Sequence, residues 1–185
     1  FEVKSNGLIP YNTSTVGTWS ATKDYYWSEV GMYLYTDFTG DGLKDLYVYY
    51  LKNPWPTNAN GLNLFSEYEK NKTTYELTKG LTQVRKCVVS DINIDKNPEI
   101  VLFSSGYDAP PFPGDSLSIF YPKEKRYQYL SKDIGYFHGG ATGDINNDGL
   151  VDIVAYSGGS VIIPVHPVAY INKGNGSFVL SNDIF

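Results

Sequence analysis

The stretch DINNDGLVD, residues 144–152, decides the fold because the chain holds two counterparts of it, DFTGDGLKD at 37–45 and DINIDKNPE at 91–99. Their first Asp residues stand at 37, 91 and 144, so the pattern recurs after 54 and then 53 residues. Self-similarity at a nearly fixed period is the signature of a repeat architecture. The three acidic segments therefore mark three copies of one structural unit.

Each acidic segment lies between two β-rich apolar runs, which predicts that it forms the tip of a hairpin. A second hairpin follows in every unit. Its sequences are LFSEYEKNKTTYELTKG at 64–80, SIFYPKEKRYQYLSKD at 118–133 and AYINKGNGSFVLSND at 169–183. Each unit is therefore expected to contain four antiparallel strands.

A repeat of this length built from four antiparallel strands is typical of a propeller blade. We expect an all-β chain forming a β-propeller or part of one, in a single domain over residues 1–185. The blades are predicted at 31–84, 85–137 and 138–185, with a partial N-terminal blade at 1–30. Closed propellers have about 4 to 8 blades. Three alternatives thus stay open: the chain is part of a longer propeller, residues 1–30 complete a small ring, or two copies close a ring together.

The acidic loops have the composition of calcium sites. Oxygen ligands at alternating positions of a short loop surround one point, and Gly at position six permits the sharp turn. The predicted ligands are Asp37, Thr39, Asp41, Leu43, Asp45, Asp91, Asn93, Asp95, Asn97, Glu99, Asp144, Asn146, Asp148, Leu150 and Asp152, with Leu43, Asn97 and Leu150 acting through their carbonyls. Up to three Ca²⁺ ions are expected, and the loop at 91–99 is predicted to bind most weakly because Lys96 replaces the glycine.

Acidic loops of this kind also occur in EF-hands and in turns that bind no metal. An EF-hand requires flanking helices and a Glu at position twelve, where this chain has Val48, Leu102 or Ala155. Turn chemistry alone also selects Asp and Asn without any metal. Three such loops in register favour the metal over the turn.

The segment GDINNDGLVDIVAYSGG at 143–159, followed by YINKGNGSF at 170–178, resembles the FG-GAP or VCBS repeats of integrin-alpha-like propellers. The resemblance covers residues 31–185. It implies a structural calcium ion in the loop between the two inner strands of each blade. Lys96, Pro98 and Glu99 in the second loop depart from the pattern.

Loops at the opposite end of the predicted strands are rich in aromatic residues. Rings beside small polar side chains suit the faces of sugars and suit protein ligands nearly as well. The candidate ligand-binding residues are Tyr25, Tyr26, Trp27, Trp55, Tyr107, Phe112, Tyr136, Phe137 and His138. The alternative for any one of these rings is packing between blades.

The composition excludes several classes of function. A net charge of −5 argues against nucleic-acid binding, which needs clustered Lys and Arg. No apolar run is long enough to span a membrane. Cys87 is the single cysteine, and neither a hydrolase motif nor a histidine-rich metal site is present. The chain is therefore expected not to be an enzyme.

These observations predict a calcium-binding module for extracellular recognition or adhesion, with a glycan or a protein as its partner. Because extracellular calcium modules bind at about 10⁻⁴ to 10⁻³ M, secretion or display on the cell surface is expected. The alternative is a scaffold or accessory part of a larger secreted polysaccharide-active enzyme or toxin.

Overall fold

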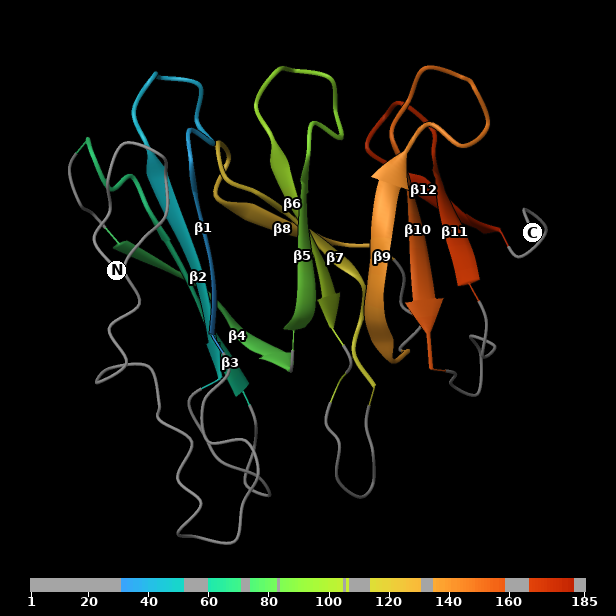
Figure 1. The fold of residues 1–185 in the computed structure, drawn as a ribbon, viewed down its shortest axis with the longest axis horizontal. Coiled ribbons are helices and arrows are strands. Elements are labelled where there is room, and N and C mark those ends of the chain that lie inside the picture. The colour runs from blue at the N-terminus through green and yellow to red at the C-terminus, as the bar shows by residue number, and fades with distance from the viewer. Residues whose placement is uncertain are drawn as a thin grey trace, which may run out of the picture. The chain divides into compact units, whose positions relative to one another are not determined.

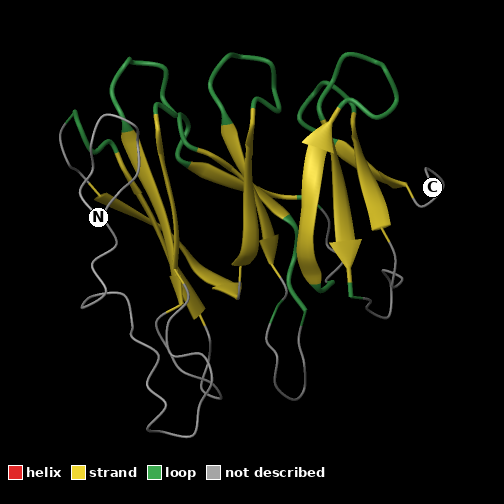
Figure 2. Cartoon of the chain, viewed as in Figure 1, coloured by secondary structure: helices red, strands yellow, loops and turns green. Residues whose placement is uncertain are grey.

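The computed structural model describes residues 31–51, 60–70, 74–82, 84–104, 106, 114–130, 135–158 and 167–181 (Figure 1, Figure 2). Among these residues, short runs rich in apolar and β-branched side chains form twelve strands, and no helix is present. The strands are β1 (Gly31–Thr36), β2 (Asp45–Leu51), β3 (Asn60–Ser66), β4 (Thr74–Thr82), β5 (Val84–Ser90), β6 (Glu99–Ser104), β7 (Ser118–Tyr121), β8 (Arg126–Tyr129), β9 (Phe137–Gly143), β10 (Asp152–Ser157), β11 (Pro167–Asn172) and β12 (Phe178–Ser181).

The strands form three four-stranded sheets in which every strand pairs with its neighbour in sequence. The first sheet is β1–β4, the second β5–β8 and the third β9–β12, and all pairings are antiparallel. The last residue of each acidic segment opens the second strand of its sheet. It pairs with the residue that ends the first strand, as in Thr36↔Asp45, Ser90↔Glu99 and Gly143↔Asp152.

The chain divides into two compact units, Phe1–Gln83 and Val84–Phe185. The N-terminal unit contains the first sheet, and Tyr47, Tyr49 and Phe65 of its strands are fully buried together with Phe38 of the loop between β1 and β2. Phe65 meets the edge of Phe38 and stacks with Tyr75, with ring centroids 6.4 and 6.5 Å apart respectively. The fully buried apolar side chains described in this unit are therefore aromatic.

The C-terminal unit buries the second and third sheets against each other. Val101 and Phe103 of the second sheet share one apolar cluster with Ile153, Ala155 and other residues of the third. The two sheets approach each other closely at β9, where a Cβ on Gly140 would lie 2.3 Å from Cε1 of Phe103 and 2.1 Å from the Val154 carbonyl oxygen. Glycine at this position therefore lets the two sheets pack together.

The structure confirms the all-β class and the four strands in each sequence repeat. It also confirms that each acidic loop lies at the tip of the first hairpin of its repeat. The predicted partial blade at 1–30 lies outside the described residues. The single domain and the closure of a ring stay predictions.

Candidate metal-binding loops

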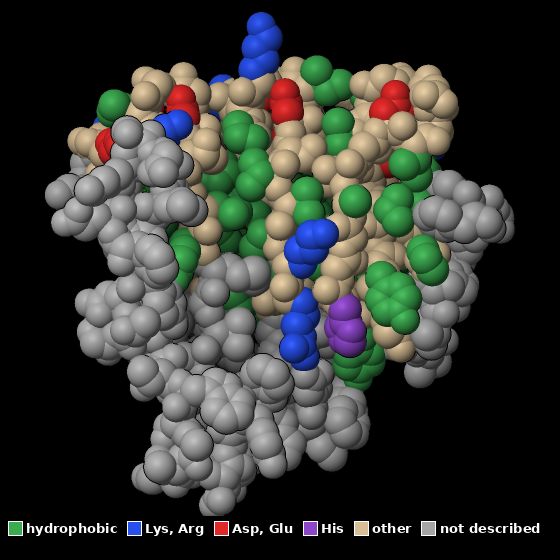
Figure 3. Space-filling model, viewed as in Figure 1, with side chains coloured by type: hydrophobic (Ala, Val, Ile, Leu, Met, Phe, Trp, Pro, Cys, Tyr) green, Lys and Arg blue, Asp and Glu red, His purple; other side chains and the backbone are tan. Residues whose placement is uncertain are grey.

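Three loops connect the first and second strands of the three sheets, and their residues are numbered here from one at the first Asp to nine at the last acid. The first loop is 37–45, the second 91–99 and the third 144–152. In the C-terminal unit, the second and third loops lie at the same end of the sheets (Figure 1). Acidic side chains gather at that end, as the red atoms in Figure 3 show.

The loops share an unusual backbone conformation. Position six has a positive φ in all three, at 84° for Gly42, 72° for Lys96 and 84° for Gly149. The strain predicted for Lys96 is therefore present. Position four repeats this feature, with φ of 78° for Gly40, 61° for Ile94 and 59° for Asn147.

The left-handed conformation is costly for a β-branched residue such as Ile94. The second loop thus contains two residues, Ile94 and Lys96, that are poorly suited to the turn, whereas the first loop has glycine at both positions. Sequence analysis identified position six but overlooked position four, although glycine at 40 and asparagine at 147 are a signal for positive φ.

Side chains at positions one, three and five fold the loop by accepting hydrogen bonds from its own amides. In the third loop, Asp144 accepts from the amides of Asp148 (3.0 Å) and Gly149 (2.9 Å), and Asp148 Oδ1 accepts from the Leu150 amide (2.9 Å). Asn146 Oδ1 accepts a second bond from the Asp148 amide. Each of these bonds fixes the direction of one oxygen-bearing side chain.

The second loop repeats this pattern, and the first loop shares part of it. Asp91 accepts from the amides of Asp95 and Lys96, and Asn93 and Asp95 accept the same bonds as their counterparts in the third loop. In the first loop, Asp37 accepts from the amides of Gly40 and Gly42 and Asp41 accepts from Leu43. Position seven, predicted to offer its carbonyl, thus donates its amide to position five in every loop.

The acid at position nine is buried and binds the main chain at the start of the loop. Asp45, Glu99 and Asp152 are at most 2% exposed. Each accepts a hydrogen bond from the amide at position two, which belongs to Phe38, Ile92 or Ile145. This side chain therefore joins the start of the loop to the strand that follows it.

Burial has a direct electrostatic effect on two of these acids. Removal from water raises the pKa of Glu99 to about 7, even though the Ile92 amide opposes this shift. Burial also raises the pKa of Asp45. A cation beside either carboxylate would favour its charged form.

The acids at position five are shifted in the opposite direction. The Leu43 amide, followed by the Lys70 ammonium, lowers the pKa of Asp41. For Asp95, partial burial acts to raise the pKa, but hydrogen bonds from Asn97 and the charge of Lys123 outweigh it, and the pKa is lowered. Both carboxylates are therefore held in the charged form that a metal ion requires.

The donor set of the loops agrees with a hard cation such as Ca²⁺. It consists of carboxylate, amide, hydroxyl and main-chain oxygens, with neither sulfur nor imidazole. The Thr39 hydroxyl at position three of the first loop is buried and interacts with the Asp45 carboxylate. Within the described part of the chain, no group of three or more His, Cys, Asp or Glu side chains converges as a metal centre. A complete coordination shell would therefore also need the amide, hydroxyl and carbonyl oxygens.

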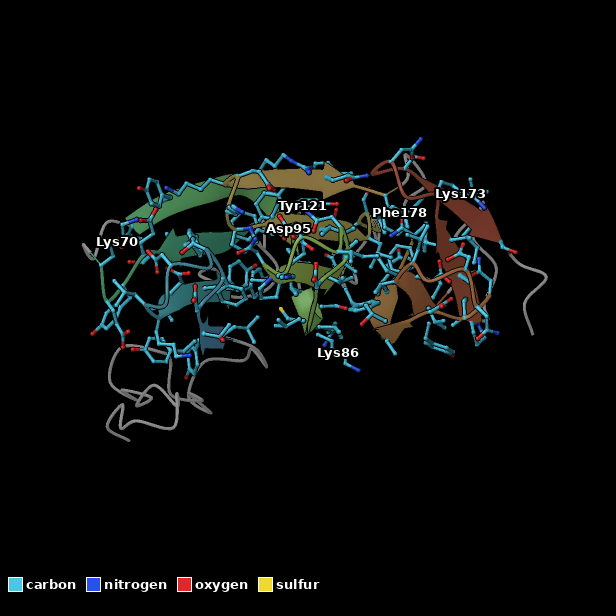
Figure 4. The ribbon with its side chains drawn as sticks, turned by 90° about the horizontal axis from the view of Figure 1, so that it is seen from above. Lys70, Lys86, Asp95, Tyr121, Lys173 and Phe178 are labelled. Atoms are coloured by element: carbon cyan, nitrogen blue, oxygen red, sulfur yellow. The ribbon has the colours of Figure 1, made fainter. Side chains whose placement is uncertain are left out.

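Asn172 connects the second and third loops within the C-terminal unit. Its side-chain amide donates to the carbonyl oxygens of Ile92 (3.0 Å) and Val151 (3.1 Å), and its main-chain amide donates to Asp152 (2.8 Å). A pocket of about 40 Å³ opens beside it, lined by Tyr121 and Phe178 among others (Figure 4). The pocket admits a few water molecules but is too small for a sugar ring.

Three of the predicted ligand-binding residues are described, and they stand where β9 begins, a strand length from the third loop. His138 is exposed and Tyr136 is partly exposed. Phe137 is a correction to the prediction, because its side chain is fully buried in the core, where it meets Tyr170 edge-on. The other six, Tyr25, Tyr26, Trp27, Trp55, Tyr107 and Phe112, lie outside the described residues.

No protein-family model, no curated protein and no solved structure matches the chain. In the portion of the chain that the structure describes, no helix could cross a membrane.

Proposed function

We propose that the chain is a calcium-stabilised, non-catalytic module, forming all or part of a β-propeller of the FG-GAP or VCBS type, that recognises a glycan or a protein outside the cell. One observation carries the proposal. Three loops at the same place in three sheets share the hydrogen bond from the amide at position six to the carboxylate at position one, and they share a positive φ at positions four and six. Turn formation alone does not require a carboxylate at position one, five and nine of every copy.

The role of the metal would be structural. Three acids within nine residues repel one another, and a divalent cation removes that cost. In the third loop, Asp144, Asn146 and Asp148 would hold the ion, which supplies the charge that fixes the inner hairpin. Occupation of all three loops would change the net charge from −5 to +1, since −5 + 6 = +1.

Isothermal titration calorimetry of residues 1–185 with Ca²⁺ tests the binding directly. We expect binding near the extracellular range of about 10⁻⁴ to 10⁻³ M, which Asp148→Ala weakens more than Asp91→Ala does. Glu124→Gln is the matched control, because it removes an acid that lies outside the loops and pairs with Arg126. A wild-type titration without heat, up to several millimolar Ca²⁺, would refute the calcium part of the proposal.

Recognition is supported by the exposed His138 and by the aromatic residues that the sequence places at the same end of the strands. In Figure 3, the histidine (purple) lies at a distance from the acidic end of the sheets (red). Glycan and protein arrays should show binding that His138→Ala or Trp55→Ala weakens. Tyr129→Ala, which removes a 51% exposed ring from β8, should leave it unchanged. Loss of binding only in folded loop variants under saturating Ca²⁺ would instead assign recognition to the acidic end.

A further inference from the structure

The carboxylate at position five has one oxygen, Oδ2, that accepts no hydrogen bond from the main-chain amides of the loop, and the side chain beside this oxygen differs among the three loops. In the first loop, Asp41 Oδ2 lies 3.3 Å from the Lys70 ammonium. In the second, Asp95 Oδ2 lies 4.0 Å from the Lys123 ammonium. In the third, Asp148 Oδ2 accepts a hydrogen bond of 2.9 Å from the Asn146 amide, which is itself part of the loop.

All three sheets have a lysine in the turn after the third strand, and among the described residues two of these lysines form an ion pair with a loop carboxylate. Lys70 is held by Glu67 (3.4 Å) in addition to Asp41. Lys173 forms no ion pair among the described residues, although its turn follows β11 just as the turn of Lys123 follows β7. Figure 4 labels Lys70 and Lys173 on their respective sheets. The chain therefore contains its own comparison between loops with and without an ammonium group.

An ammonium group and a divalent cation cannot both be close to one carboxylate oxygen without strong mutual repulsion. The lysine side chains are about half exposed, so they can turn into water at little cost. Binding of the metal to the first or second loop must therefore displace or repel the lysine, whereas binding to the third loop displaces only a neutral amide.

We propose that Lys70 and Lys123 are built-in counter-ions of the first and second loops, which stabilise these loops without metal and lower their affinity for Ca²⁺ relative to the third loop. This inference rests on the calcium binding proposed above. The order of Ca²⁺ affinity among the loops would then depend on lysines that lie outside the acidic segments. The module would then retain folded first and second loops when calcium is scarce, and would fill its third loop first.

Removal of one ammonium group should have two effects of opposite sign. Lys70→Gln should raise the affinity of the first loop for Ca²⁺ by roughly three- to tenfold, and should lower the melting temperature in chelator by about 1 to 3 °C. Lys123→Gln should act in the same directions on the second loop, with about a twofold gain, because its ion pair is longer. A variant that merely damaged the fold would lower both quantities.

The loop amides at position six can report each site separately. The amides of Gly42, Lys96 and Gly149 donate to the carboxylates at position one, so their ¹H–¹⁵N signals should shift as each loop fills. We would titrate the wild type, Lys70→Gln, Lys123→Gln and the matched control Lys173→Gln with CaCl₂. We expect Gly149 to respond first in the wild type, Gly42 to respond earlier in Lys70→Gln, and no change in Lys173→Gln.

Two failures can be told apart. If the wild-type amides do not respond to Ca²⁺, the proposed calcium binding fails and the inference fails with it. If they respond but Gly42 titrates identically in the wild type and Lys70→Gln, the counter-ion role is wrong and calcium binding stands. A gain of equal size in Lys173→Gln would also overturn the inference, since it would reflect net charge alone.

Discussion

At the scale of single residues, the three loops differ in how well their side chains suit one shared backbone path. The first and third loops have glycine at position six, and the second has Lys96 at a φ of 72°. A left-handed conformation costs a residue with a Cβ about 1 kcal/mol or more relative to glycine. The second loop is therefore folded against a local preference.

Replacement at position six should change stability in opposite directions in the second and third loops. We expect Lys96→Gly to raise the free energy of unfolding by about 1 kcal/mol and Gly149→Ala to lower it by a similar amount. No atom lies within 4 Å of a Cβ on Gly149, so backbone conformation alone decides the result there. Urea denaturation of both variants in chelator measures this. Equal signs for the two changes would contradict the strain argument.

Glu99 should make the metal-free protein sensitive to pH. Its pKa is about 7 in the folded state, against an ordinary value of 4.5. The folded state therefore holds the proton more tightly, so this contribution to stability is complete below about pH 4.5 and is lost as the pH rises through 7. In Glu99→Gln, the urea midpoint in chelator should fall less between pH 4.5 and pH 8 than it does in the wild type. A wild-type midpoint that rises across this window in step with the variant would contradict the assignment.

At the scale of strands and loops, the pairing of β9 with its neighbours depends on one glycine. A Cβ on Gly140 would meet Phe103 and the Val154 carbonyl at less than 3 Å, whereas a Cβ on Gly139 would meet only Lys86 Cδ at 3.6 Å. The two positions are adjacent on the same strand, so they form a matched pair.

Gly140→Ala should therefore destabilise the C-terminal unit by about 1 to 3 kcal/mol, because the second and third sheets must move apart. Gly139→Ala should change stability by less than about 0.5 kcal/mol. Thermal unfolding followed by circular dichroism compares the two. Similar melting temperatures for both variants would mean that the space around Gly140 can accept a methyl group.

Local sequence patterns predicted the strands and the position of the loops, because alternating apolar residues and Asp-rich turns act over a few residues. They did not predict that Phe137 is buried or that Lys70 contacts Asp41. Both depend on residues distant in sequence: Phe137 packs on Tyr170, and Lys70 reaches the loop through a turn that Glu69 ties to Lys44. Periodicity within one segment contains no information about such partners.

At the scale of the whole molecule, the first sheet has an apolar side that is only partly buried. Ile153 and Ala155 of the third sheet are buried against the second sheet. Their counterparts in the first sheet, Leu46 and Val48, are only partly buried and line a hollow of about 170 Å³ with Leu64. Apolar sheet faces of this kind favour association with another sheet.

We therefore expect isolated residues 1–185 to self-associate at micromolar concentration. Val48→Glu should weaken the association, because it places a charge in the hollow of the first sheet. Val89→Glu is the control, since Val89 is already 40% exposed on β5. Sedimentation velocity with circular dichroism as a folding check compares the three proteins. A stable monomer at all concentrations would instead favour a small ring closed by residues 1–30.

Thermal unfolding of the wild-type chain with and without Ca²⁺ tests most directly the central claim that the three acidic loops are metal sites. A ligand at about a hundred times its dissociation constant stabilises the folded state by about 2.7 kcal/mol per site, which is at least about 5 °C for a domain of this size. We expect a rise of that size or more in excess Ca²⁺ relative to EDTA, and a smaller rise with Mg²⁺, which demands a stricter geometry. Superimposable melting curves in Ca²⁺ and EDTA would contradict metal binding by the loops.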